Sequence, residues 1–272
     1  MKTYAVTVTV LAAIVLTTNN LPAVHAAAGL PPALETAKQA LDASPRHGEF
    51  AYIAMPDNEM KLKTFVVYPE VNEKAPVIIV IHEIFGMTDW VNSIADALAA
   101  EGFIAVAPDL ISGMEGAEEN PRATIGQLTD DELIKRLNVV RDYALALPAA
   151  NGKLGCIGFC WGGKSTFLYA TAQPDLDAAV VYYGTSPATE KLASINAPVL
   201  GVYGENDERV NSTIQAAEEE MKRLGKSFEK EIYAGAGHGF LRQQSGQDGA
   251  NRKATEQAWP RTIAFLKEHT AR

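Results

Sequence analysis

Short runs of apolar residues alternate along this chain with longer segments in which apolar residues recur every three to four positions. The most continuous run, residues 75–82, is aliphatic and rich in β-branched residues, which is typical of a strand buried on both faces of a parallel sheet. Similar runs predict strands at residues 103–107, 154–157, 178–183, 197–203 and 228–233. Residues 49–55 and 61–69 are also predicted strands and are expected to form an antiparallel edge.

Helical spacing follows most of these strands. It is predicted over residues 89–101, after a Thr88 N-cap, and over residues 129–147, 164–173, 210–224 and 254–269. Residues 111–128 contain several glycines and are interpreted as a long loop near the mouth of a site. The alternation of strands and helices predicts an α/β fold, with a mostly parallel sheet and helices on both faces.

Composition and charge narrow the range of partners. The chain has 272 residues, of which 47% are hydrophobic, and a formal net charge of −9. An acidic chain without a basic cluster argues against nucleic acid as a partner, because phosphate recognition needs concentrated Lys and Arg. No His/Cys cluster has metal-ligand spacing, so no metal is predicted.

The N-terminus has the pattern of a cleavable signal peptide. Lys2 precedes an apolar run over residues 4–16, and residues 24–26 fit the small-x-small pattern before a cleavage site. The run is shorter than the ~20 residues of a membrane span, so no stable anchor is expected. We therefore predict a signal peptide over residues 1–26, a linker and short helix over 27–48, and the α/β domain over 49–272. The mature protein is expected in the periplasm or outside the cell.

The segment Gly158-Phe159-Cys160-Trp161-Gly162-Gly163 lies between a predicted strand and a predicted helix. Strand, G-x-C-x-G and helix in this order match the nucleophile elbow of α/β-hydrolases, with Cys in place of the usual Ser. Glycines are needed there because the turn is tight and the helix packs close to the strand. The alternative is a Gly-rich turn with a structural cysteine, since free Cys is often buried. We expect both Cys156 and Cys160 to be free thiols.

Asp207 and His238 follow two later predicted strands, so Cys160, Asp207 and His238 occur in the chain order of an α/β-hydrolase triad. Groups at the carboxyl ends of parallel strands meet at one edge of the sheet. His238 would accept the thiol proton and Asp207 would orient the imidazole. The backbone N–H groups of Trp161 and Ile84 are candidates for the oxyanion hole. Alternatively, Asp207 caps the next helix, and His238 is a solvated turn residue.

Taken with these motifs, the chain resembles the dienelactone hydrolases (carboxymethylenebutenolidases). The resemblance runs from about residue 50 to the C-terminus and is carried by His82-Glu83-Ile84-Phe85-Gly86, Pro108-Asp109-Leu110, the Cys160 motif, residues 204–207 and Gly237-His238-Gly239-Phe240. It implies an eight-stranded α/β-hydrolase domain with a Cys-His-Asp triad and without a metal or organic cofactor.

The resemblance also implies roles for Glu83 and Arg242. In the family, the Glu at this position contacts the resting thiol and helps to activate it, and an Arg four positions after the His binds the substrate carboxylate. The family's second carboxylate-binding Arg lies just after the Pro-Asp-Leu stretch, where this chain has none. The nearest later Arg is Arg122, which is too far along the sequence for the family role to be carried over to it. Among the aromatic residues, Phe85, Trp90, Trp161 and Tyr183 are candidates to line the substrate pocket, although aromatics at strand ends are as often part of the core.

These observations predict a cysteine hydrolase that cleaves a small lactone or carboxylic ester through an acyl-enzyme, and that is expected to be a monomer. One alternative keeps the fold and changes the reaction to that of a peptidase or acyltransferase. The other is a non-catalytic binding or redox-sensing protein in which Cys160 no longer serves as a nucleophile.

Overall fold

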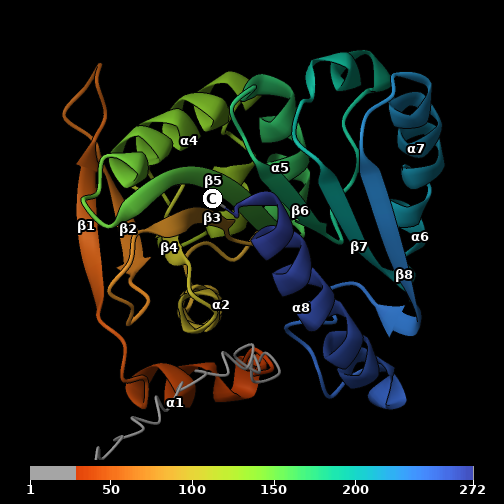
Figure 1. The fold of residues 1–272 in the computed structure, drawn as a ribbon, viewed down its shortest axis with the longest axis horizontal. Coiled ribbons are helices and arrows are strands. Elements are labelled where there is room, and N and C mark those ends of the chain that lie inside the picture. Colours follow the sequence, from red (N-terminus) through yellow and green to blue (C-terminus); the bar gives the residue numbers. More distant parts are fainter. Residues whose placement is uncertain (1–28, 272) are drawn as a thin grey trace, which may run out of the picture.

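The computed structural model describes residues 29–271, and its centre is one eight-stranded sheet (Figure 1). The strands are β1 (Gly48–Ala54), β2 (Lys61–Val67), β3 (Ala75–Ile81), β4 (Ile104–Pro108), β5 (Ala150–Phe159), β6 (Ala178–Tyr182), β7 (Val199–Asn206) and β8 (Phe228–Gly237). Their order across the sheet is β1-β2-β4-β3-β5-β6-β7-β8. The β1–β2 and β2–β4 pairs are antiparallel and all others are parallel, which confirms the predicted mostly parallel sheet.

Helices cover both faces of this sheet, as the sequence predicts. They are α1 (Ala37–Asp42), α2 (Asp89–Ala100), α3 (Pro121–Ile125), α4 (Asp130–Leu145), α5 (Trp161–Ala172), α6 (Glu208–Asn211), α7 (Ile214–Arg223) and α8 (Ala250–His269), with 3-10 turns η1 (Leu34–Thr36), η2 (Thr189–Ser194) and η3 (Gln247–Gly249). Residues of α2 and α8 pack on one face, and residues of α4, α5 and α7 pack on the other (Figure 1).

The two cores follow from the pleat of the central strands. In β3, Ile78 and Val80 belong to the core under α2 and α8, whereas Val77 and Ile79 belong to the core under α4 and α5. Because successive side chains of a strand point to opposite faces, a strand covered on both sides must be apolar at every position. This requirement explains the uninterrupted aliphatic run of residues 75–81.

Two predicted segments differ in the structure. The loop predicted at residues 111–128 contains α3, whose start is fixed by the Asn120 side chain, which accepts a hydrogen bond from the Ala123 N–H, and by Pro121 in the first turn. The single helix predicted over residues 210–224 is divided into α6 and α7. The hydroxyls of Ser212 and Thr213 donate to backbone carbonyls one turn earlier, and such bonds compete with helix continuation.

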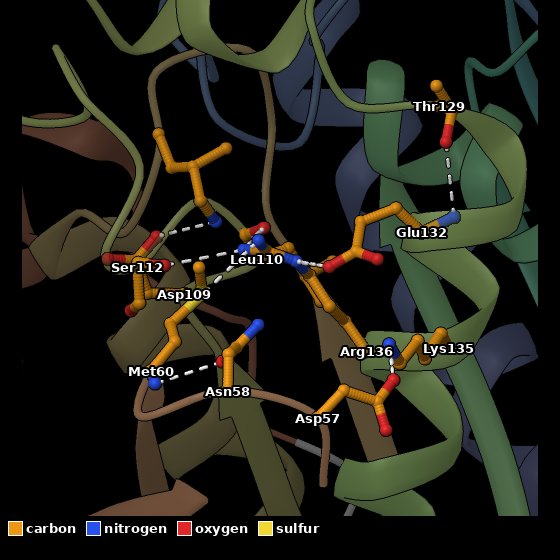
Figure 2. A network of polar contacts seen from close by, with 11 residues as sticks. Asp57, Asn58, Met60, Asp109, Leu110, Ser112, Thr129, Glu132, Lys135 and Arg136 are labelled. Carbon is orange, nitrogen blue, oxygen red and sulfur yellow. Dashed lines mark hydrogen bonds and ion pairs between the residues drawn. The ribbon is translucent and has the colours of Figure 1, made fainter. Parts of the chain in front are cut away.

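The start of the segment that carries α3, just after β4, is held by a buried arginine on α4 (Figure 2). Arg136 Nη1 donates to the carbonyl oxygens of Leu110 at 2.9 Å and Ser112 at 3.3 Å, and its Nε donates to Glu132 Oε1 at 3.0 Å. Ser112 Oγ accepts from the Lys63 N–H of β2. The path of residues 109–112 is therefore set by contacts with α4 and β2, distant in sequence.

The described part of the N-terminal region also packs on the domain. Trp90 Nε1 of α2 donates to the Pro32 carbonyl oxygen, and Gln244 Nε2 donates to that of Pro31. None of the helices within residues 29–271 is both long and apolar enough to cross a membrane. The predicted signal peptide, residues 1–26, lies outside the described residues, so export stays a prediction.

Candidate active site

Cys160 occupies the sharp turn between β5 and α5. Its φ of 58° and ψ of −113° lie in a region that non-glycine residues rarely adopt, as expected for a nucleophile elbow. A Cβ on Gly158 would lie 2.1 Å from the Gly162 carbonyl oxygen, and one on Gly162 would lie 2.3 Å from that of Ile81. The two glycines are thus required by backbone packing around the turn.

His238 and Asp207 lie in a row with this cysteine. His238 Nε2 is 3.1 Å from Cys160 Sγ, and His238 Nδ1 is 2.5 Å from Asp207 Oδ2. Asp207 follows β7 and His238 follows β8, so adjacent parallel strands bring them to the same edge. The Asp207 side chain makes no hydrogen bond to the first turn of α6, so helix capping does not account for it.

The surroundings of His238 favour its protonated form. Burial lowers the pKa of the imidazole, but hydrogen bonds to Asp207 and Cys160, together with their negative charges, outweigh burial and raise the pKa to about 9. The ring also contacts Tyr183 edge-on, with centroids 5.1 Å apart. An imidazolium between a carboxylate and a sulfur is the arrangement in which a thiol loses its proton most readily.

A cavity of about 440 Å³ opens at the sulfur. Cys160, His238, Trp161, Ile84 and Tyr183 all line it, so the structure brings both oxyanion-hole candidates to the nucleophile candidate. Trp161 is the first residue of α5, a position whose N–H has no partner within the helix.

A buried histidine, His82, links the backbone of Glu83 with that of Leu110, and the sequence alone predicts no role for it. His82 is fully buried at the end of β3 and stacks on Trp161, with ring centroids 5.2 Å apart. Its Nε2 accepts from the Leu110 N–H at 3.2 Å, so Nδ1 carries the proton and donates to the Glu83 carbonyl oxygen at 2.7 Å. Burial lowers the pKa of His82, in keeping with a neutral ring.

Glu83 and Arg242 pair with each other. Arg242 Nε lies 2.7 Å from Glu83 Oε2, and both side chains are largely buried. Burial raises the pKa of Glu83, and the positive charges of Arg242 and His238 oppose this effect. The Arg242 guanidinium also lies over the Phe85 ring, 4.8 Å from its centroid. In this arrangement the hydrogen-bond partner of the Cys160 sulfur is His238, and the carboxylate of Glu83 faces Arg242.

The predicted pocket aromatics lie in different places. Tyr183 is buried and lines the cavity at Cys160. Phe85 is half exposed and lines a separate hollow of about 430 Å³, together with Gly86 and Asp89. Trp90 is fully buried in the core against Phe159.

Three cationic side chains also line the cavity at Cys160. They are Arg122 of α3, Lys164 of α5 and Arg209 of α6. Arg122 lies too far along the sequence from the Pro-Asp-Leu stretch to be equated with the family's second arginine, yet it lines this cavity. The segment after β4 returns to the cavity through α3, a helix within the predicted loop of residues 111–128. Among residues 29–271, no group of three or more His, Cys, Asp or Glu side chains is placed to hold a metal ion.

The sheet order and the elbow define an α/β-hydrolase. Within that superfamily, the family model described as "Dienelactone hydrolase family" matches residues 62–270, and the chain belongs to this family. It is similar to the Escherichia coli (strain K12) protein named "Putative carboxymethylenebutenolidase", at 29% identity over 71% of this chain and 77% of that protein. It is 31% identical to "Protein usf" of Aquifex pyrophilus, over 78% of this chain and 95% of that protein.

Solved structures agree with this assignment. The crystal structure of a "Putative Dienelactone Hydrolase" from Klebsiella pneumoniae superposes with a TM-score of 0.70 at 25% identity, over 82% of this chain and 99% of that one. An acylaminoacyl peptidase from Pyrococcus horikoshii shares the fold alone, with a TM-score of 0.67 at 15% identity over 86% of this chain and 44% of that one. The protein is a hydrolase of the dienelactone hydrolase family.

Proposed function

We propose that this protein hydrolyses a lactone or carboxylic ester with Cys160 as the nucleophile. The observation that carries the proposal is the row of Cys160, His238 and Asp207, with contacts of 3.1 Å and 2.5 Å, at the edge of a 440 Å³ cavity. Each group has the neighbour that its role requires: a base beside the thiol and a carboxylate behind the base.

In the proposed reaction, His238 Nε2 already holds the proton given up by the Cys160 thiol, and the resulting thiolate sulfur forms a bond to the ester carbonyl carbon. The carbonyl oxygen becomes an oxyanion, which the N–H groups of Trp161 and Ile84 stabilise. The carbon–oxygen bond to the leaving group then breaks, and the alkoxide takes the proton from His238. A water molecule, deprotonated by the same imidazole, attacks the thioester and releases the acid and the Cys160 thiolate.

Glu83 takes part in thiol activation in this proposal, and its ion pair sets a condition on that role. The carboxylate faces Arg242, so it would have to leave this pair before it could approach the sulfur of Cys160. Until then, its charge acts on His238 at a distance. Arg242, fixed by Glu83 and Phe85, serves in this resting arrangement as a partner of Glu83.

The chain offers a matched control for testing the nucleophile, because it has two free cysteines. Burial raises the pKa of Cys156 to about 12, so its thiol is inert at neutral pH. Hydrolysis of p-nitrophenyl acetate should fall at least a thousandfold in Cys160→Ala and less than twofold in Cys156→Ala, on the ~10³–10⁶-fold scale of lost nucleophilic catalysis. Mass spectrometry of the wild type should show one acetyl group on Cys160.

Two outcomes would contradict the proposal. If Cys160→Ala retains the wild-type rate, another group is the nucleophile. If no activated ester acylates reduced Cys160, the protein is a binding module with this fold. Parallel assay of an anilide with the same acyl group separates esterase from peptidase, since amide cleavage demands a stronger general acid for its poor leaving group.

A further inference from the structure

The two N–H groups proposed to stabilise the oxyanion belong to residues that are far apart in the chain. Trp161 begins α5, where the helix itself fixes the peptide, whereas Ile84 lies in the loop after β3. Both residues line the cavity at Cys160, and the Ile84 N–H has no backbone hydrogen-bond partner within residues 29–271. An oxyanion hole is effective when its donors are fixed before the charge develops. The Ile84 peptide, outside any helix or strand, therefore needs another group to hold it.

The side chain of His82 holds this peptide. Its Nδ1–H donates to the Glu83 carbonyl oxygen at 2.7 Å, and this carbonyl belongs to the same peptide unit as the Ile84 N–H. The peptide is trans, so its C=O and N–H point in opposite directions. With the carbonyl held toward the imidazole, the Ile84 N–H points away from it. The Gly86 N–H also donates to this oxygen, but at the longer distance of 3.3 Å.

The imidazole of His82 is itself fixed in position. Its Nε2 accepts from the Leu110 N–H at 3.2 Å, which keeps the proton on Nδ1, where the Glu83 carbonyl oxygen needs it. One face of the ring stacks on Trp161, with an interplanar angle of 26°, and the side chain is fully buried. A donor without rotational freedom restricts the peptide more than a flexible side chain would.

The backbone of His82 also lies directly against the nucleophile elbow. A Cβ on Gly162 would lie 2.5 Å from the His82 carbonyl oxygen, so the first turn of α5 packs on the end of β3 without space between them. Ile81 and Gly158 are paired in the adjacent parallel strands β3 and β5. These contacts fix the loop of Ile84 relative to the turn that carries Trp161 and the sulfur.

We propose that His82 is a positioning residue for the oxyanion hole, and that it directs the Ile84 N–H into the cavity through its bond to the Glu83 carbonyl oxygen. This inference rests on the proposed esterase function and adds the side chain that sets the geometry of its oxyanion donors. Loss of one oxyanion donor lowers kcat about 10²–10³-fold. Loss of its orientation alone should lower kcat/KM less, by roughly tenfold to a hundredfold, since a displacement of about 1 Å has effects of that size.

Two substitutions separate the two hydrogen bonds of His82. The amide nitrogen of Asn is as many bonds from the backbone as Nδ1 of His, so His82→Asn keeps the donor to the Glu83 carbonyl oxygen and loses the acceptor for the Leu110 N–H. His82→Leu removes both. We expect kcat/KM for p-nitrophenyl hexanoate to fall roughly tenfold to a hundredfold in His82→Leu, and to stay within about threefold of the wild type in His82→Asn.

A second reaction of the same sulfur shows whether the effect lies in the oxyanion hole. Iodoacetamide alkylates a thiolate by displacement at its CH₂ carbon: the S–C bond forms as the C–I bond breaks, and iodide leaves without an oxyanion. The rate of Cys160 alkylation at neutral pH should therefore stay within about twofold of the wild type in both variants. Mass spectrometry should show a single carbamidomethyl group, because Cys156 has a pKa of about 12 and stays unreactive.

Thr262→Val is the control for lost stability. It removes a buried hydrogen bond between the hydroxyls of Thr262 and Tyr182, 2.7 Å apart and outside the cavity lining. The substitution should lower the melting temperature and leave both the ester rate and the alkylation rate unchanged. A variant of His82 that slows only the ester reaction then differs from a protein that is merely less stable.

Three results would overturn the inference: an unchanged ester rate in His82→Leu, a loss of the same size in ester hydrolysis and alkylation, or a loss in His82→Asn as large as in His82→Leu. The last result would assign the effect to the Leu110 contact. If His82→Leu does not fold, His82→Phe, which keeps a ring against Trp161 but lacks the donor, takes its place with the same expected rates. If the wild type is alkylated but hydrolyses no activated ester, the proposed function itself fails.

Discussion

At the scale of single residues, the imidazole of His238 is where the geometry predicts a pH dependence. Its pKa of about 9 means that the ring holds its proton through neutral pH in the free protein. The proton is needed when an alkoxide leaves, but not when p-nitrophenolate leaves, since that anion is stable without protonation. The leaving group should therefore decide how the rate behaves above pH 9.

We predict that kcat/KM for a methyl ester falls about tenfold per pH unit above pH 9, as His238 loses its proton, whereas kcat/KM for the p-nitrophenyl ester of the same acid does not fall there. Because kcat/KM depends only on the steps from the free protein up to acylation, the rate of deacylation does not affect these profiles. The measurement is a pair of pH–rate profiles between pH 5 and 10.5. His47→Gln, at an exposed histidine far from the cavity lining, should reproduce both profiles. Identical profiles for the two esters would exclude His238 as the proton donor to the leaving group.

At the scale of elements, Arg136 of α4 supports the segment that carries α3 and Arg122. Replacing it with Met keeps the apolar stem but leaves the buried carbonyl oxygens of Leu110 and Ser112 without donors. An unsatisfied buried carbonyl costs about 1–3 kcal/mol, so Arg136→Met should lower the free energy of unfolding by about 2–4 kcal/mol. Urea denaturation monitored by tryptophan fluorescence measures this loss.

Lys135→Met is the matched control on the same helix. Lys135 pairs with Asp57 at the surface, where solvent screens the pair, so its loss should change the free energy of unfolding far less than the loss of Arg136. A loss in Lys135→Met as large as that in Arg136→Met would show that α4 is sensitive to any lost charge, and that the buried contacts with residues 110 and 112 have no special importance.

The triad candidates and Arg122 show which parts of the site the sequence could predict and which it could not. Cys160, Asp207 and His238 each come directly after a strand, so their convergence follows from the order of strands in the chain. The elbow is equally local, because Gly158 and Gly162 are required by the turn itself. The position of Arg122, in contrast, depends on how the chain from β4 through α3 returns to the cavity. The start of this segment is held by the contacts of Arg136 with the carbonyl oxygens of residues 110 and 112, and no spacing rule encodes those contacts.

The Glu83–Arg242 pair is a second feature that sequence patterns could not give. The family resemblance placed each residue at the site, but their pairing depends on side-chain geometry between two loops that are far apart in the chain. The same is true of His82. Its hydrogen bonds to the backbones of Glu83 and Leu110 could be predicted only if the distance between the ends of β3 and β4 were known. Side-chain partnerships between loops require the folded structure.

At the scale of the whole molecule, residues 29–47, which include the predicted short helix as α1, pack against the domain that follows them. Ala37 is buried in the core under α2 and α8, and Arg46 pairs with Asp96 at 2.5 Å. The Leu34 N–H donates to the Arg242 carbonyl oxygen at 3.0 Å. The N-terminal region thus touches α2 and the loop of Arg242, which links the beginning of the chain to the site.

We therefore predict different effects for two N-terminal truncations. A chain beginning at residue 27, as after removal of the predicted signal peptide, keeps all of these contacts. A chain beginning at residue 37 loses the Pro32 carbonyl partner of Trp90 and the bond from Leu34 to Arg242. It also loses the Pro31 carbonyl partner of Gln244, whose Nε2 keeps its bond to the Leu241 carbonyl oxygen. The two lost side-chain bonds alone amount to about 1–3 kcal/mol, and at ~2–4 °C per kcal/mol for a domain of this size the melting temperature should fall by roughly 2–12 °C.

Differential scanning calorimetry of the full chain and both truncations measures the change in melting temperature. The kcat/KM for p-nitrophenyl hexanoate shows whether the truncation also changes the geometry of the site. Because Arg242 holds Glu83, loosening its backbone should lower kcat/KM for the hexanoate in the chain beginning at residue 37, and leave it unchanged in the chain beginning at residue 27. Equal melting temperatures for the two truncations would make residues 29–36 a dispensable surface segment. A lower melting temperature with an unchanged rate would instead confine their role to the core around Trp90 and separate the stability of the domain from the geometry of its site.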